Sequence, residues 1–333
     1  MDNTSIDFTS FTQTILKNLQ EKLGSDYTVF SHNVKKNNGI ELTGIVAKRT
    51  GCSTSPTIYI NNFYREDITE EETERVSEAL FNEFRASEFE EDMDLSGFAL
   101  FDRAKKKLAF KLINAEKNKE LLRSVPHRLF HNLAIVFYYT VQEAPFYGKA
   151  TILVRDSHMK KWGTNADELM EIAQQNTPAL FPSVIDDMTD VMREILSESL
   201  REDITGAKIG AEEKAELLDE KWFDDLINQM SRDDGSRKIP MYVLTNRQKL
   251  YGAACMLYPE VLKKFAEKMR QDFYVLPSSV HEVILVPANA GTDQESLREI
   301  VTDINRTQVA EDEVLADSVY FYSRSRDKIV WLS

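Results

Sequence analysis

The sequence predicts an α+β fold in which mixed, largely antiparallel sheets pack against amphipathic helices in two lobes. The order of elements in the last hundred residues is ββαββαββ, which mixes hairpins with helices and favours α+β over a doubly wound parallel sheet. Over the 333 residues, 42% are hydrophobic and 29% are charged, as in ordinary globular proteins. That length suffices for two domains.

The N-terminal elements follow from apolar spacing and turn residues. Apolar side chains recur every three or four positions over residues 8–23, which predicts a helix that Gly24 ends. The turn residues Asn37–Gly39 favour a hairpin. Thr69 followed by Glu72 has the spacing of a capping box and predicts a second helix. Strands are expected at Tyr27–Val34, Ile40–Ala47 and Thr57–Asn61.

The middle of the chain is less regular. A helix is expected from about Asn165 to Gln175, ending before Pro178. Two long amphipathic helices should follow, with apolar stripes at 188–196 and 218–230 and acidic residues on their opposite faces. Strands are expected at Leu108–Ile113 and at Leu133–Val141 with Lys149–Arg155, the last two forming a hairpin.

The C-terminal hundred residues carry the clearest signals. Helices are predicted where apolar residues repeat at 261–269 and 297–304. We place the lobe boundary so that residues 1–124 form an N-terminal α+β lobe and residues 125–333 a C-terminal one. Strands are predicted at Met241–Thr245, Gly252–Tyr258, Phe273–Leu276, His281–Val286, Ser318–Ser323 and Lys328–Leu332.

The net charge of −14 is unevenly distributed. The segment 186–235, predicted to be helical, holds 16 acids and 6 bases. Such a surface repels phosphate backbones, so we expect no nucleic-acid partner. It is suited to attract a basic protein partner, and the oligomeric state is left open.

Cysteine content and hydropathy predict a cytoplasmic protein. Two cysteines form no disulfide framework, and four-thiolate zinc sites are excluded by count. The N-terminus lacks the basic region of a secretory signal, and the longest apolar runs are too short to span a bilayer, so no membrane association is expected. His127 and His131 could be metal ligands on one helix face, but packing or surface roles are favoured, and we expect no metal and no cofactor.

The most specific candidate for catalysis is a cysteine nucleophile. Cys255 is followed by His281 and then by Asn289 and Asp293, the chain order of a thiol hydrolase. The small residues before Cys255 favour instead a buried packing role. The common phosphate-binding loops and hydrolase and zinc-protease motifs are absent.

A second candidate is a binding site at Ser278, Ser279, His281 and Glu282. Hydroxyls, an imidazole and a carboxylate gather there at a break between two predicted strands, where loops bring polar groups together. The alternative is a turn in which the serines cap backbone groups.

Four stretches of the sequence resemble a bacterial family known under a domain-of-unknown-function label: 125–141, 158–182, 241–262 and 272–288. The last two, MYVLTNRQKLYGAACMLYPEVL and DFYVLPSSVHEVILVPA, are the most specific. The resemblance implies a cytosolic bacterial protein and carries no catalytic or binding residues over to this chain. The favoured hypothesis is a non-enzymatic interaction or regulatory protein that presents an acidic helical surface. The alternative is a hydrolase using Cys255 and His281.

Overall fold

A computed structural model confirms the α+β class. The chain divides into two compact units, one formed by Met1–Lys107 and Tyr138–Gly163, the other by Leu108–Phe137 and Thr164–Ser333. The expected division into lobes 1–124 and 125–333 stays a prediction. The structure describes residues 6–52, 55–86, 96–141, 150–194, 240–288 and 293–332.

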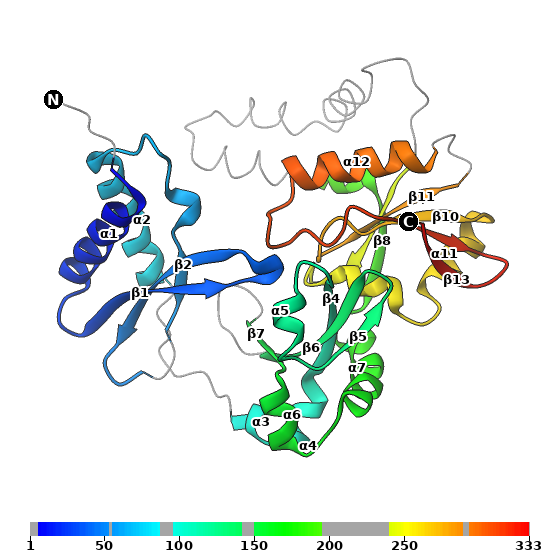
Figure 1. The fold of residues 1–333 in the computed structure, drawn as a ribbon, viewed down its shortest axis with the longest axis horizontal. Helices are drawn as coiled ribbons and strands as arrows, with labels where there is room; N and C mark the ends of the chain where they lie inside the picture. The colour runs from blue at the N-terminus through cyan, green and yellow to red at the C-terminus, as the bar shows by residue number, and fades with distance from the viewer. Residues whose placement is uncertain are drawn as a thin grey trace, which may run out of the picture. The chain divides into compact units, whose positions relative to one another are not determined.

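The first unit begins with a three-stranded antiparallel sheet, in the order β1-β2-β3, and two helices. Apolar side chains of both helices meet the sheet in one core, which includes Ile15, Leu80 and Ile45. Figure 1 shows α1 and α2 together on one side of β1 and β2. The predicted helix end is confirmed, since Gly24 caps α1 with a φ of 78°. The elements are α1 (Phe8–Leu23), β1 (Tyr27–Lys35), η1 (Asn37–Gly39), β2 (Glu41–Arg49), β3 (Thr57–Tyr59), η2 (Asn61–Phe63) and α2 (Glu70–Ala86).

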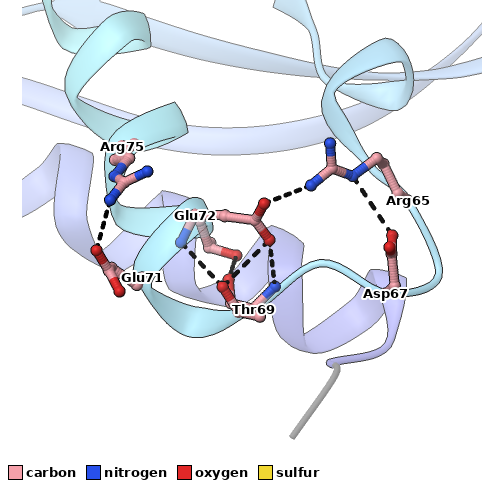
Figure 2. Close-up of polar contacts among 7 residues, drawn as sticks. Arg65, Asp67, Thr69, Glu71, Glu72 and Arg75 are labelled. Atoms are coloured by element: carbon pink, nitrogen blue, oxygen red, sulfur yellow. Dashed lines mark hydrogen bonds and ion pairs between the residues drawn. The ribbon is translucent and has the colours of Figure 1, made fainter. Parts of the chain in front are cut away.

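The predicted capping box is present at the start of α2 (Figure 2). The Thr69 hydroxyl accepts a hydrogen bond from the Glu72 backbone N–H at 3.3 Å, and the Glu72 carboxylate accepts one from the Thr69 N–H at 3.0 Å. Arg65 forms a further ion pair with Glu72. The Thr69 backbone N–H is the main reason why the pKa of Glu72 lies below its ordinary value. These bonds satisfy N–H groups that a helix start leaves without partners.

We expect Thr69→Ala to lower the free energy of unfolding by about 1 kcal/mol, because the N–H of Glu72 loses its acceptor. Thr69→Ser keeps the hydroxyl and should stay close to the parent protein. Urea denaturation of both variants measures the difference. Equal stability of the two variants would mean that the box contributes nothing.

The remaining described elements of the first unit surround the C-terminal half of strand β6 (Leu133–Val141). The indole of Trp162 donates a hydrogen bond to the Phe98 carbonyl at 3.1 Å, and both rings pack edge to face at 5.1 Å. The elements are α3 (Ser96–Ala99), α4 (Phe101–Ala104), η3 (Lys105–Lys107), β7 (Ala150–Leu153) and α6 (Asp156–Trp162).

The second unit contains a six-stranded sheet in the order β13-β12-β10-β11-β9-β8, in which every pairing is antiparallel. One face packs against α12, where Leu297 and Val301 join the strand residues in a core (Figure 1). On the other face Phe273 stacks on Tyr322 and meets Phe265 of α11. The elements are β8 (Ser183–Asp187), β9 (Tyr242–Asn246), α11 (Val261–Met269), β10 (Phe273–Leu276), β11 (Val283–Pro287), α12 (Gln294–Thr307), β12 (Val319–Ser323) and β13 (Lys328–Leu332).

A further sheet has the order β4-β6-β5, and β6 also pairs with β7. All nine residues of β6 are buried, and the predicted pairing of β6 with β7 is confirmed. Helix α7 packs on β4, where the Thr177 hydroxyl accepts a hydrogen bond from the Phe110 N–H at 3.1 Å. The elements are β4 (Leu108–Asn114), α5 (Lys119–Leu122), β5 (His127–Phe130), β6 (Leu133–Val141) and α7 (Ala166–Leu180).

Two predicted elements are wrong. Residues Gly252–Leu257 form a 3-10 helix, η4, instead of a strand, because Tyr251 adopts a left-handed conformation that turns the chain. Helix α7 continues through Pro178. Its last turn is held by the buried Thr177, whose contact with β4 outweighs the missing proline N–H.

The acidic segment 186–235 is only partly helical in the described residues. Asp186 and Asp187 belong to β8, so the predicted helix at these two residues is wrong, since the edge of the sheet pairs them with Val243 and Tyr242. Residues 188–194 are helical as expected. The rest of the segment, from residue 195, and the second predicted helix at 218–230 lie outside the described residues.

Candidate functional site

The predicted binding segment connects β10 to β11 and is anchored along its whole length. The Ser278 carbonyl accepts a hydrogen bond from the Leu315 N–H at 2.7 Å, and the Val280 N–H donates to the Glu313 carbonyl at 2.9 Å. Ser278 and Ser279 are each only 3% exposed. The segment is therefore part of a rigid framework.

The hydroxyls of this region hold the backbone of His281. Ser279 Oγ accepts a hydrogen bond from the His281 N–H at 3.0 Å, and Thr245 Oγ1 donates to the His281 carbonyl at 2.7 Å. For Ser279 this is the capping role considered as the alternative to binding. The backbone of His281 is thus held by one side chain of its own segment and one from β9.

The imidazole of His281 links two further segments. Nδ1 accepts a hydrogen bond from the Tyr251 backbone N–H at 3.2 Å, so the neutral ring carries its proton on Nε2, which lies 3.4 Å from Glu313 Oε1. The hydrogen bond from His281 holds the pKa of Glu313 below its ordinary value. His281 stacks on the Tyr251 ring at 5.7 Å, and the ammonium of Lys111 lies 3.9 Å from the centre of that ring. We call Lys111, Tyr251, His281, Glu282 and Glu313 the histidine cluster.

Glu282 differs electrostatically from Glu313. Burial raises the pKa of Glu282, and the neighbouring His281 and a hydrogen bond with Ser279 only partly oppose this effect. The two carboxyls of the cluster therefore have pKa values moved in opposite directions, as in sites that separate an acid from a base. The side chains of Lys111, His281 and Glu313 each contact another member of the cluster, which fixes their positions relative to one another.

The loop that presents Tyr251 is strained and tightly packed. Lys249 and Tyr251 both have a φ of 51°, a conformation that costs side-chain-bearing residues free energy and often marks functional segments. Asn246, 1% exposed, holds the loop through its side chain, which donates to the Leu250 carbonyl at 2.7 Å. The left-handed conformation of the loop is therefore maintained by its hydrogen bonds with Asn246, because the residues themselves do not favour it.

The described contacts of the hydrolase residues are those of packing and capping groups. Cys255 is 0% exposed, and burial raises its thiol pKa to about 12, so the thiolate is disfavoured at neutral pH. Both ring nitrogens of His281 are engaged by Tyr251 and Glu313. Asp293 caps α12, where it accepts a hydrogen bond from the Ser296 N–H, and Asn289 lies outside the described residues. The hydrolase stays a hypothesis that no described contact supports.

We expect a thiol reagent at about pH 8 to label Cys52 in the folded protein and to label Cys255 only after unfolding, because reaction requires an accessible thiolate. Cys52→Ser isolates the Cys255 signal, which mass spectrometry can follow with and without urea. Rapid labelling of Cys255 in the folded variant would revive the hydrolase hypothesis.

The two carboxyls of the histidine cluster should have opposite effects on stability. The lowered pKa of Glu313 gives stabilisation that is present above its unfolded pKa and lost as pH falls through the folded value. The raised pKa of Glu282 gives the reverse, a contribution lost as pH rises through the folded value.

We therefore expect Glu313→Gln to destabilise at about pH 7 and to be neutral in acid, by less than ~1 kcal/mol since Glu313 is half exposed. For Glu282→Gln the stability relative to the parent protein should be higher at about pH 7 than in acid, because the parent loses stability when Glu282 ionises. Urea unfolding at both pH values measures each variant. The same sign for both variants would contradict the assignment.

His127 and His131 do not share a helix face. His127 begins β5 and His131 lies in the turn before β6 with a φ of 54°, while the His127 ring bonds to the Val125 carbonyl at 2.9 Å. Among the described residues there is no group of three or more His, Cys, Asp or Glu side chains that could hold a metal ion.

Sequence reasoning found His281 and Glu282 but missed their partners. Lys111, Tyr251 and Glu313 come from three other segments of the second unit, and no motif or spacing relates them. The positive φ of Tyr251 is the feature that places its ring against His281, and a tyrosine gives no sequence signal for it.

A groove of about 590 Å³ lies beside the edge strand β8 in the second unit. Its residues on the β8 side include Asp186, Asp187 and Asp190, and Lys264 and Lys268 of α11 line it as well. We call this the acidic groove. It lies where β8 ends and the helical residues 188–194 begin.

Fold and site define an α+β protein with a structurally anchored polar cluster and an open charged groove. The chain belongs to a family of unknown function (DUF5688), whose model matches residues 8–324. This confirms the resemblance to a family of that kind. No curated protein and no solved structure matches the chain.

None of the described helices has the length and apolar character that crossing a membrane requires.

Proposed function

We propose that this chain is a non-enzymatic cytoplasmic interaction or regulatory protein that binds a basic protein partner through its acidic surface. The observation that supports the proposal is the acidic groove, where Asp186, Asp187 and Asp190 line an open hollow beside a strand edge. Carboxylates at a groove attract and orient a lysine- or arginine-bearing segment.

The edge of β8 suits an extended partner. Within the described part of the chain β8 pairs with β9 alone, so an incoming segment can add as a strand along its other side. Asp186 is exposed on this strand. Lys264 and Lys268 of α11 repel basic side chains, so the basic residues of the partner must lie on the β8 side of the groove. The proposal therefore specifies an extended segment with basic residues on one side.

The test uses a fluorescent peptide that alternates lysine and valine, with affinity measured by anisotropy at low and at physiological salt. We expect binding that weakens steeply with salt, and Asp186→Asn/Asp187→Asn/Asp190→Asn to weaken it by about tenfold, since exposed charge pairs contribute up to ~1 kcal/mol each.

The matched control removes three acids elsewhere: Glu66→Gln/Glu74→Gln/Glu83→Gln, all exposed in the first unit. Its net charge equals that of the groove variant, so it reports the general effect of charge. Equal loss in both variants, or no binding at low salt, would overturn the proposal.

A further inference from the structure

A second hollow, of about 570 Å³, lies where three segments of the second unit meet. These are the loop after α11, the end of β11 and the turn between β12 and β13. We call it the arginine hollow. Its lining is Arg270, Gln271, Asp272, Ala288, Arg324 and Ser325.

Asp272 ties the three segments together. Its backbone carbonyl accepts a hydrogen bond from the Ala288 N–H at 3.0 Å, and its carboxylate accepts one from the Arg324 N–H at 2.8 Å. The backbone positions of Arg270 and Arg324 are thus fixed relative to each other, as a binding site requires. These hydrogen bonds therefore fix the three segments around the hollow relative to one another.

The two arginines differ from five others in the described part of the chain, which are paired with carboxylates. Arg65, Arg75, Arg128, Arg193 and Arg306 all form ion pairs with carboxylates. Neither Arg270 nor Arg324 has a side-chain hydrogen bond or ion pair with a described residue. Arg270 also holds a φ of 58° directly after α11, a conformation that usually favours glycine.

In a chain of net charge −14, two guanidinium groups line one hollow together with a single carboxylate, that of Asp272. Two cationic side chains that line one hollow favour a ligand of opposite charge. A guanidinium binds two oxygens of a tetrahedral oxyanion at once, and the Ser325 hydroxyl adds a donor. Asp272 reduces the net charge of the lining to about +1, which favours an anion with several acceptor oxygens over a simple halide.

We propose that the arginine hollow binds a phosphate group, either free or carried by a phosphorylated side chain. Arg270 and Arg324 would hold its oxygens from two segments, and Ser325 would donate from the turn. This site is independent of the acidic groove, because the two hollows share no lining residue.

The experiment titrates the full chain at constant ionic strength with inorganic phosphate, a phosphoserine peptide and its unphosphorylated form, and follows binding by calorimetry. We expect saturable binding of at least one phosphate form and none of the unphosphorylated peptide. Tighter binding of the phosphopeptide assigns the site to a protein partner, and tighter binding of inorganic phosphate assigns it to a small molecule.

Arg270→Gln and Arg324→Gln should each weaken binding by about tenfold, since each removes a charge-assisted contact. The lysine substitutions should recover part of the loss, because they restore charge without the paired donors. Arg247→Gln, an exposed arginine outside the hollow, should have no effect. The proposal would be overturned if Arg270→Gln and Arg324→Gln bound phosphate no more weakly than Arg247→Gln does. It would also be overturned if chloride bound as strongly as phosphate.

Discussion

Gly252→Ala is expected to lower the free energy of unfolding by about 3 kcal/mol, among the largest effects of a single methyl group in this chain. The added carbon would lie 2.2 Å from the Thr245 hydroxyl oxygen and 2.3 Å from the His281 carbonyl oxygen. The backbone N of Asn246 is a third close atom, at 2.9 Å. Because two of these atoms are backbone, relief requires the β9 end and the β10–β11 connection to move apart.

Urea denaturation measures this loss, with Gly51→Ala as the control. Gly51 has a φ of 89° and nothing within 4 Å of the added carbon, so its cost is conformational only, about 1 kcal/mol. A Gly252→Ala variant no less stable than Gly51→Ala would show that the two segments are not packed as described.

Asn246→Ala should cost about 3 kcal/mol, because three hydrogen bonds of about 1 kcal/mol each are lost in a buried place. Its amide donates to the Leu250 carbonyl at 2.7 Å. Its carbonyl oxygen accepts from the N–H groups of Gln248 at 3.1 Å and Leu250 at 3.2 Å. Without it the left-handed loop that carries Tyr251 loses its support, so the contact of Tyr251 with His281 should weaken as well.

Chemical denaturation gives the stability, and the ring signals of His281 in NMR spectra report the loop. Asn62→Ala is the control, since Asn62 is exposed and should change stability by less than ~0.5 kcal/mol. Unchanged His281 signals in a destabilised Asn246→Ala variant would contradict the link between loop and imidazole.

Elements with strong local signals could be predicted from the sequence. The apolar repeat of α1, the capping box of α2 and the terminal hairpin of β12 and β13 each depend on neighbouring residues, and all three are confirmed. Strand β8 was missed, because it is short and ends in two acids, and its pairing with β9 is decided far away in the chain. The small side chains of residues 252–257 favour a strand in the sequence. The left-handed conformation of Tyr251, which the sequence does not reveal, precedes a 3-10 helix there instead.

The candidate site was predictable only where its residues are adjacent in sequence. Ser278–Glu282 could be found as a polar cluster at a strand break. The residues that complete it are contributed by tertiary structure, so Glu313 and Tyr251 carry no recognisable pattern. The sequence context also favoured burial of Cys255, which the structure shows as 0% exposed.

Met188 directly follows β8 and Met241 directly precedes β9, and the N–H of Met188 donates a hydrogen bond to the carbonyl of Met241 at 2.9 Å. Met188 and Met241 are thus held next to each other. The entropy of closing a flexible loop between two fixed ends changes by only about 0.6 kcal/mol for each doubling of its length. Residues inserted between Met188 and Met241 are therefore expected to leave the register of β8 against β9 unchanged.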